Sequence, residues 1–426
     1  MPSVVLLLPK AGYRNEDFLA AASRLGVQVL IASDFCHQLA SHWETPQVFK
    51  FRDAELAAEA LAASARELRP AAVVGLDDQT ALVATLAAQR LGLPHNPVAA
   101  VASARDKQLS RTKLRDAGLP VPRFLIAERG DVSDGLLARA PYPCVVKPLV
   151  LAGSRGVMRA DTPAELRTAL QRLDALLRSP DVAQRRDPGL ERVILEQFIP
   201  GPEVALEGLL VQGRLHVLAL FDKPDPLDGP FFEETLYVTP SRHPADLQDS
   251  VARMVSDGCR ALGLVEGPIH AELRLSADGP RILEVAARSI GGLCGRALRF
   301  GVGVTLEELV LQHALGRFKG TPPPRERAAA GVLMLPIRKR GILAEVNGVE
   351  AARAVPLVED VKITAHLQEE LVPLPEGSSY LGFIFARGET PAAVEAALRH
   401  AGSLVEARVH PKLNVGVSGT PYVIPT

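Results

Sequence analysis

The chain has 426 residues, of which 47% are hydrophobic and 23% charged, and its 48 basic and 49 acidic side chains leave a formal net charge of -1. At roughly 150 residues a domain, this composition predicts a globular protein of about three domains and excludes disordered and collagen-like chains. The near-neutral charge and an aromatic content of 4% argue against nucleic acid as a partner. Binding of that kind needs basic surface for phosphates and exposed rings for bases.

The sequence carries no export or membrane signal. No run reaches the ~18–20 consecutive apolar residues of a membrane helix, and the first apolar run, Val4 to Leu8, stops at Pro9 without a basic leader. The cysteines are Cys36, Cys144, Cys259 and Cys294. They form no Cys-x-x-Cys pair, so neither a zinc site nor a disulfide framework is indicated, and we expect a cytoplasmic protein that does not bind membranes.

Residues 1–105 are expected to form an α/β domain. Apolar runs at 4–8, 27–31 and 71–75 alternate with alanine-rich helical stretches at 54–68 and 80–91, which predicts a parallel sheet of the Rossmann-like type. No Gly-x-Gly-x-x-Gly follows the first strand, so a dinucleotide site is not predicted. Asp77 and Asp78 end the third strand, where open α/β sheets bind ligands, but Asp78 is equally suited to cap the next helix.

A second, mixed α+β domain is expected over residues 106–318. A helix at 103–117 ends at Gly118 and is followed by the extended segment Leu119-Pro120-Val121-Pro122. Further strands are predicted at 144–147, 193–199 and 204–211, helices at 163–178 and 306–315, and loops at 180–189 and 222–230.

The prolines at 322–324 indicate a linker to a C-terminal α+β domain. That domain is expected over residues 325–426. Its predicted elements are strands at 332–337 and 380–386 and a helix at 391–401.

A predicted hairpin over residues 269–288 carries the most informative polar pattern. A turn centred on Asp278 pairs Glu272 with Glu284, and the two-residue period of a strand puts His270 and Arg288 on the same face. Two carboxylates held roughly 4.5–5.5 Å apart across strands are destabilising unless a cation lies between them, and Mg²⁺ prefers such oxygen ligands. The alternative is a solvated face whose glutamates pair with nearby arginines.

A second pattern combines two lysines with a glycine loop. Lys147 ends an apolar strand 40 residues after Lys107 and is followed by Gly153-Ser154-Arg155-Gly156. Glycines let backbone N–H groups approach phosphate oxygens, while an ammonium balances their charge. A plain strand connection is the alternative for the loop.

A third pattern is a strand that ends at a Pro-Gly-Pro turn. It contains Glu196-Gln197-Phe198-Ile199 and is followed after the turn by Glu203. Backbone exposed at such a break is able to hydrogen-bond an adenine edge, and Glu203 to reach ribose hydroxyls. Taken alone, the segment is equally a hairpin turn.

Because these three patterns occur in this order, the chain resembles the ATP-grasp superfamily, specifically carboxylate-amine ligases of the L-amino acid ligase (dipeptide synthetase) type. The resemblance implies a pre-ATP-grasp domain, an ATP-grasp domain with a lid at about 149–195, and a C-terminal closing domain. It implies ATP and Mg²⁺ as cofactors, with two ions and with Mn²⁺ as a substitute. It also implies small-molecule substrates, an amino acid and an amine, and is compatible with a homodimer.

The resemblance further implies a role for each matched residue. The ATP-binding residues would be Lys107, Lys147, Gly153, Ser154, Arg155, Gly156, Glu196, Gln197, Phe198, Ile199 and Glu203. Glu272 and Glu284 would bind the metal, and Arg288 would steady the transferred phosphate and the tetrahedral intermediate. The substrate residues would be His270, Glu234, Gly291 and Gly292. The chain departs from many members at Ala286, where asparagine is a further metal ligand, so either two glutamates suffice or metal affinity is weakened.

The expected reaction is phosphorylation of a carboxylate by ATP followed by attack of an amine, with ADP and phosphate released. Two other functions are considered. A bicarbonate-activating carboxylase is disfavoured by Glu233-Glu234-Thr235-Leu236, which replaces the Glu-Glu-Ala-Pro expected there. A silent ATP-binding regulatory module is disfavoured because the acidic pair and Arg288 are kept together.

Overall fold

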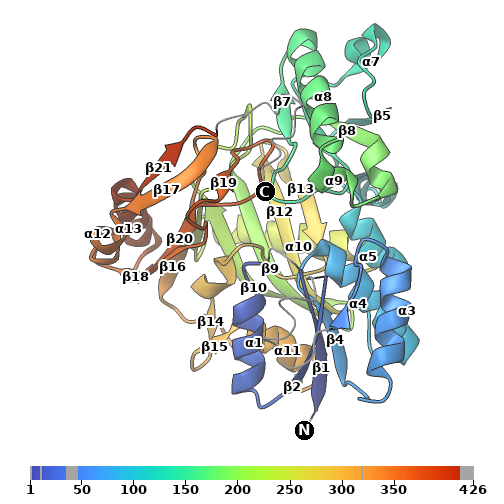
Figure 1. Cartoon of the computed structure of the whole chain (residues 1–426), viewed down its shortest axis with the longest axis vertical. Coiled ribbons are helices and arrows are strands. Elements are labelled where there is room, and N and C mark those ends of the chain that lie inside the picture. Colours follow the sequence, from blue (N-terminus) through green and yellow to red (C-terminus); the bar gives the residue numbers. More distant parts are fainter. Residues whose placement is uncertain (1, 10–11, 35–46, 318–319, 413–426) are drawn as a thin grey trace, which may run out of the picture.

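A computed structural model describes residues 2–9, 12–34, 47–317 and 320–412 (Figure 1). Cys36 and the last residues of the predicted C-terminal domain lie outside the described residues. The other three cysteines, Cys144, Cys259 and Cys294, are free and buried.

The N-terminal segment forms the predicted parallel sheet, in the order β3-β2-β1-β4. Its strands are β1 (Ser3–Leu8), β2 (Gln28–Ser33), β3 (Gln47–Val48) and β4 (Ala72–Gly75). Its helices are α1 (Asn15–Arg24), which the sequence analysis did not predict, α3 (Ala54–Ala65) and α4 (Asp78–Leu91). The cap of α4 is Asp77, in a capping box with Thr80, so the side chain of Asp78 is left for another role.

The helix predicted at 103–117 is wrong in one respect, because it is two helices. α5 (Val98–Arg105) ends at Asp106, whose backbone is extended (φ -96°, ψ 116°), and α6 (Lys107–Asp116) begins directly after it. The Asp106 side chain accepts a hydrogen bond from Leu109 N and caps the new helix. The break places Lys107 at the first position of α6.

Residues 124–197 build a separate antiparallel sheet in the order β5-β8-β6-β7, which stands at the top of Figure 1. Its strands are β5 (Phe124–Glu128), β6 (Cys144–Pro148), β7 (Met158–Ala160) and β8 (Arg192–Gln197). Helices α7 (Asp134–Arg139) and α8 (Pro163–Leu177) share a hydrophobic cluster with it. The predicted loop at 180–189 contains the short helix α9 (Pro180–Ala183) and leads into the 3-10 turn η1 (Pro188–Glu191).

The central layer is an antiparallel sheet in the order β13-β12-β9-β10-β11-β16-β20-β18. Its first strands are β9 (Glu203–Val211), β10 (Arg214–Lys223), β11 (Leu236–Thr239), β12 (Gly267–Ser276) and β13 (Gly279–Ala286). The C-terminal segment adds β16 (Ala329–Leu335), β18 (Val358–Ile363) and β20 (Gly382–Gly388), because β16 pairs with β11. β10 extends to Lys223, so the loop begins two residues later than the predicted start at residue 222.

The remaining elements cover this layer and complete the C-terminal segment. The helices are α10 (Ala245–Leu262), α11 (Leu306–Ala314), α12 (Val349–Arg353) and α13 (Pro391–Leu404). Two small sheets are formed by β14 (Arg299–Phe300) with β15 (Val304–Thr305), and by β17 (Gly341–Asn347) with β19 (Glu370–Leu371) and β21 (Glu406–His410). The turn η2 (Cys294–Ala297) follows β13.

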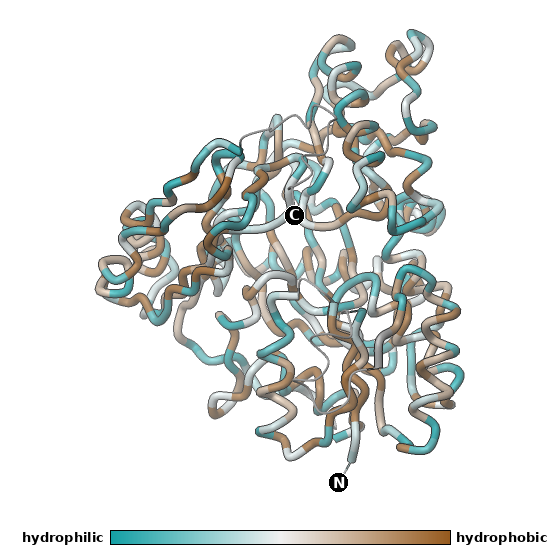
Figure 2. The backbone as a smooth tube through the Cα atoms, viewed as in Figure 1, coloured by the Kyte–Doolittle hydropathy of each residue, from teal (hydrophilic) through white to brown (hydrophobic). Residues whose placement is uncertain are grey.

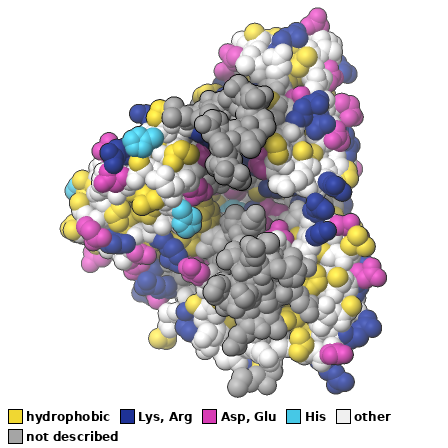
Figure 3. All heavy atoms as spheres, in the orientation of Figure 1, with side chains coloured by type: hydrophobic (Ala, Val, Ile, Leu, Met, Phe, Trp, Pro, Cys, Tyr) yellow, Lys and Arg dark blue, Asp and Glu magenta, His cyan; other side chains and the backbone are white. Residues whose placement is uncertain are grey.

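One hydrophobic cluster joins all three predicted domains. It contains Leu6 of β1, Phe221 of β10 and Phe383 of β20, each nearly or fully buried. In Figure 2, β1 is a continuous hydrophobic stretch just above the N-terminus. The face drawn in Figure 3 has basic and acidic side chains interspersed over its coloured atoms. Within the described ranges, we find no helix with both the length and the apolar character needed to cross a membrane.

Candidate active site

A cavity of about 960 Å³ lies where the upper sheet, the central sheet and the ends of the N-terminal strands meet. Every predicted site residue lines it except Gly156. The glycine loop, Lys107 and the β12–β13 hairpin all contribute residues to its lining. The C-terminal segment closes it through Met334, Ser378 and Tyr380.

Gly156 lies outside this cavity and has a packing role instead. Its φ of +76° is strained for any other residue, and a Cβ there would stand 2.8 Å from Leu173 Cδ1. Its amide N–H donates to Pro375 O at 2.8 Å. In this structure Gly156 therefore shapes the loop, and its contact with ATP stays a prediction.

The β12–β13 hairpin has the predicted strand register up to Glu272, and the register shifts between Glu272 and the turn. His270 pairs with Ala286, and Glu272 pairs with Glu284. A bulge follows, so that Leu273 pairs with Ile282 instead of the expected Leu283. Leu283 lines the cavity as a result, a position that strict alternation placed in the core.

Glu196 is the centre of a buried ion-pair group. Its carboxylate lies 2.6 Å from Lys147 Nζ and 2.6 Å from Arg111 Nε, and Arg111 also donates to Leu283 O at 2.6 Å. Burial alone would raise the pKa of Glu196, but Arg111 and Lys147 outweigh it and lower the pKa to about 2. Sequence reasoning missed Arg111, although it stands four residues after Lys107 and therefore on the same face of α6.

Lys107 is fixed against the strand end that precedes the glycine loop. Its Nζ donates to Leu151 O at 2.8 Å and its backbone N–H to Leu149 O at 3.2 Å. Burial lowers the pKa of Lys107, whereas the negative charge of Glu284 opposes that shift and the positive charge of Lys147 adds to it. Two ammonium groups are thus held on one wall, a cationic environment suited to phosphates.

The glycine loop and the end of β8 with Phe198 are also held by protein contacts. Arg155 pairs with Asp181 at 2.5 Å and donates to Glu376 O at 2.7 Å. The guanidinium groups of Arg159 and Arg274 each lie over the Phe198 ring, at 4.1 and 5.2 Å from its centroid. Both segments line the cavity, so they stay candidates for ATP contacts.

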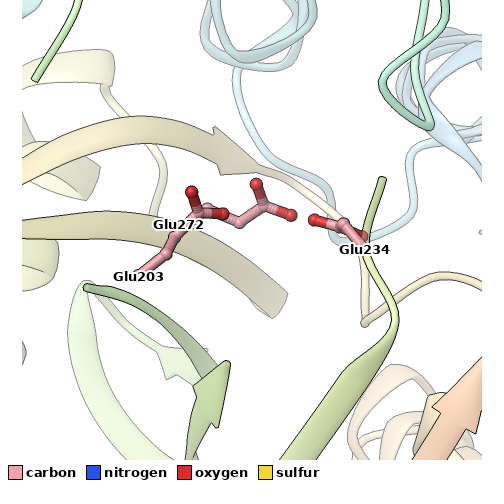
Figure 4. Close-up of side chains that lie close together, drawn as sticks. All are labelled: Glu203, Glu234 and Glu272. Carbon is pink, nitrogen blue, oxygen red and sulfur yellow. The ribbon is translucent and has the colours of Figure 1, made fainter. Parts of the chain in front are cut away.

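Three carboxylates converge in the site, from Glu203 of β9, Glu234 and Glu272 of β12 (Figure 4). One oxygen of each lies within 4.8 Å of the others. The Lys223 ammonium lies among them, at 2.5 Å from Glu203, 2.6 Å from Glu234 and 3.5 Å from Glu272. Burial and the Glu272 charge raise the pKa of Glu234, although Lys223 opposes them.

This arrangement modifies the prediction for Glu203. Its second oxygen pairs with Arg274 Nε at 3.1 Å, so its carboxylate is engaged by two buried cations. Glu203 is therefore part of an internal charge network at the cavity wall, and its contact with a ribose stays a prediction. Lys223 was not singled out from the sequence, although it stands in the Asp222-Lys223-Pro224 segment.

His270 lies between two carboxylates. Its ring nitrogens are 3.3 Å from Glu207 and 3.3 Å from Glu272. Burial would lower the pKa of His270, but both carboxylates outweigh it and raise the pKa to about 9. The fully buried Glu207 also accepts from Ile290 N at 3.0 Å. Sequence reasoning did not identify Glu207 because it occurs within an apolar strand.

Arg288 stands at the end of the hairpin beside Asp78 of α4. Its Nε lies 3.0 Å from Asp78 Oδ1, and its Nη2 lies 3.7 Å from Glu284 Oε1. Burial acts to lower the pKa of Arg288, but these carboxylates raise it above its ordinary value. Gly291 and Gly292 follow, and Gly292 has a φ of +59° with its space limited by Phe383.

The donor set fits a magnesium ion. Glu272 and Glu284 are neighbours across two strands, line the same cavity and supply only oxygen ligands, which Mg²⁺ prefers. Lys107 and Lys147 face the same space, where the phosphates that share such an ion would lie.

Comparison with known proteins assigns the chain to a family. Residues 140–297 match the ATP-grasp domain, and residues 333–410 match the L-amino acid ligase C-terminal domain 2. The chain belongs to the ATP-grasp ligase family. The crystal structure of an L-amino acid ligase from Bacillus licheniformis superposes with a TM-score of 0.81 at 27% identity, covering 96% of this chain and 99% of that one. The predicted fold and family are thereby confirmed.

Several curated relatives of this ATP-grasp chain are named as synthases or ligases. Carnosine synthase 1 of Gallus gallus is 30% identical over 387 residues, which are 84% of this chain and 41% of the relative. D-alanine–D-alanine ligase of Aromatoleum aromaticum is 30% identical over 213 residues, 49% of this chain and 64% of the relative. The chain thus spans about half the length of the curated relatives it matches.

Proposed function

We propose that this ATP-grasp protein is an ATP-dependent carboxylate-amine ligase. It activates an amino-acid carboxylate as an acyl phosphate and couples it to an amine, forming an amide or dipeptide and releasing ADP and phosphate. The observation that carries the proposal is one cavity that unites the opposed Glu272 and Glu284, the paired Lys107 and Lys147, and Arg288. The L-amino acid ligase C-terminal domain borders the same cavity.

The nucleotide would occupy the side lined by Lys107, Lys147 and the glycine loop. Gly153, Ser154 and Arg155 would contact its phosphates, and residues 196–199 its adenine. Glu272 and Glu284 would hold magnesium, as two ions and with Mn²⁺ as a substitute. Bound magnesium supplies neutralisation of charge on the phosphoryl group. Lys107 and Lys147 would orient that group and add to the same effect.

The chemistry follows from charge and leaving groups. A carboxylate oxygen of the first substrate attacks the γ-phosphorus, the bond to the β-phosphate oxygen breaks, and ADP leaves. An amine then attacks the acyl carbon, loses a proton, and inorganic phosphate departs with the electron pair of the C–O bond. Arg288 would stabilise the developing oxyanion, and the substrate side would be formed by His270, Glu234, Gly291 and Gly292.

Release of phosphate and ADP from Mg-ATP, measured with single and paired amino acids and with product masses recorded, tests this function. Turnover only with an amino acid, with one dehydrated pair formed for each ADP, is the expected result. Turnover with bicarbonate alone would instead establish a carboxylase. Nucleotide-dependent thermal stabilisation without turnover on any substrate would establish a regulatory ATP-binding module.

Three further features stay proposals. The first is a pair of domain boundaries near residues 105 and 318–325. The second boundary falls between the ranges matched by the two family models, 140–297 and 333–410, and the central sheet runs across it. We also propose action in the cytoplasm and assembly as a homodimer. Fractionation of cells and light scattering of the purified protein test these two.

A further inference from the structure

Arg14 is a buried arginine that the reaction outlined above does not use. It precedes α1, lines the cavity and is 6% exposed. Its Nη1 donates to Ser289 Oγ at 2.5 Å, and its Nη2 donates to Leu76 O. A guanidinium has five N–H donors, so these two contacts leave it incompletely satisfied.

The other arginines around the cavity that carry an ion pair show what Arg14 lacks. Arg288 pairs with Asp78, Arg105 with Asp187, and Arg155 with Asp181. Over the described ranges, no carboxylate oxygen lies within 4.0 Å of an Arg14 nitrogen.

The acids whose charges reach Arg14 are engaged elsewhere or are themselves buried. Glu207 binds His270 and Ile290 N, and Asp77 caps α4 through Thr80. Glu307 is buried in α11, and its own burial raises its pKa. A buried cation without a partner is costly, which favours an anion supplied by the cavity.

The position of Arg14 close to Arg288 indicates which chemical group that anion is. Arg288 Nη1 donates to Ser289 O at 3.1 Å, so Arg14 and Arg288 contact the same residue from the same wall. The charge of Arg288 is already matched by Asp78 and Glu284. In an α-amino acid, the carboxylate carbon is only two bonds from the amine. An amino acid whose amine attacks beside Arg288 therefore brings its own carboxylate to this wall.

We propose that Arg14 binds the unreacting α-carboxylate of the amine substrate and thereby selects α-amino acids as acceptors over amines that lack a carboxylate. This inference rests on the proposed ligase function and names a specificity-determining residue for its acceptor. A bidentate pair with Arg14 would give such an acceptor its preference over amines that lack a carboxylate.

The experiment compares each of the twenty common L-amino acids with its own C-terminal amide as acceptor. Donors are first identified by hydroxamate formation with hydroxylamine, a small nucleophile without a carboxylate. We then measure kcat/KM for each acid and amide with the wild type, Arg14→Gln and Arg14→Lys. Arg24→Gln, which removes an arginine of α1 that pairs with Glu308 outside the cavity, is the matched control.

The wild type and Arg24→Gln should prefer the acid, and Arg14→Gln should reduce the ratio of acid to amide by about 10–100-fold, the value of a charge-assisted hydrogen bond. Arg14→Lys should give an intermediate ratio, because it keeps the charge but not the planar fork. A loss of folding alone would lower both rates and leave the ratio unchanged. If Arg14→Gln does not fold, the ratio of acid to amide kcat/KM measured with Arg14→Lys tests the proposal instead.

Two results would overturn the inference while leaving the ligase function intact. One is a wild type that couples acids and amides equally well. The other is a ratio that no Arg14 variant alters, as expected if Arg14 binds the phosphoryl group or the reacting carboxylate. Absence of hydroxamate and of ADP with every donor would instead contradict the ligase function itself.

Discussion

Glu284 faces Glu272 across the β12–β13 hairpin, just before the bulge that shifts the strand register, and both side chains line the cavity. We predict that Glu284→Ala abolishes ATP turnover, by about a thousandfold or more, because it removes an oxygen ligand and charge from the phosphoryl-transfer site. Phosphate release measures the loss. Arg281→Ala, on the same strand near the turn, should retain turnover, and both variants should unfold at similar temperatures. Wild-type turnover by Glu284→Ala would exclude the metal assignment.

Glu196 makes stability depend on pH through its contacts with Lys147 and Arg111. Its pKa of about 2 is below the ~4.3 of an unfolded glutamate, so its stabilisation is complete above the unfolded value. It is lost as the pH falls toward 2. We therefore predict that the gap in unfolding free energy between wild type and Glu196→Gln narrows from pH 5 to pH 3.

Urea unfolding at closely spaced pH values measures that gap. The comparison of two variants cancels the titration of other carboxylates. A gap that is constant over this range would show that the folded-state pKa of Glu196 is not depressed.

At the scale of elements, the upper sheet is docked on the C-terminal segment 375–378. Arg172 of α8 holds the Glu376 carboxylate through Nε at 2.5 Å and Nη2 at 2.9 Å, and the glycine loop bonds to the backbone of Pro375 and Glu376. Residues of the upper sheet and residues 375–378, more than 200 positions apart in the chain, are therefore held together beside the cavity.

Glu376→Gln should weaken this docking without disturbing either core. We predict a several-fold rise in KM for ATP with a small change in melting temperature, because the pair is partly exposed and contributes little to stability. Glu191→Gln, which removes an exposed partner of Arg129 in the same sheet, is the control and should leave KM unchanged. Equal KM values for both variants would contradict a role of this contact in closure.

The elements themselves were largely predictable, and the exceptions have physical causes. The two-residue period and the turn residues identified the hairpin, and continuous apolar runs between helical stretches identified the N-terminal strands. The break at Asp106 was missed because its neighbours are good helix formers, and only the cap on Leu109 N reveals it. The bulge beside Glu272 was missed because alternation assumes one residue for one residue.

At the scale of the whole molecule, the three predicted domains share a core. Phe383 is fully buried and contacts the rings of Tyr13 and Tyr380, with centroids 5.1 and 5.8 Å apart. We predict that Phe383→Ala lowers the free energy of unfolding by about 3–5 kcal/mol, since a large buried ring leaves a cavity.

Calorimetry measures this effect as a lower melting temperature of the main transition. The control is Leu367→Ala, whose side chain is 63% exposed, and it should change stability little. A shift confined to a minor transition would show that the C-terminal segment unfolds independently of the rest.

The candidate site was predictable where its residues carry chemistry within a short stretch of sequence. Glu272, Glu284 and Arg288 fall within one hairpin and its exit, and Lys147 stands at the end of an apolar strand. The partners Arg111, Lys223, Glu207 and Asp78 were not assigned, because each contacts a residue far away in the chain. Glu203 and Gly156 also have protein contacts that the sequence did not indicate, an ion pair with Lys223 and a hydrogen bond to Pro375 O.

The sequence by itself determined the family, the main strands and helices of the N-terminal domain, and the opposed carboxylates of the hairpin, because periodicity and turn residues act over a few positions. Only the tertiary structure decided which charges are matched. Lys223 is surrounded by three glutamates, whereas Arg14 is buried without one. The energy of a buried charge depends on what packs around it from distant segments, and that arrangement exists only in the folded chain.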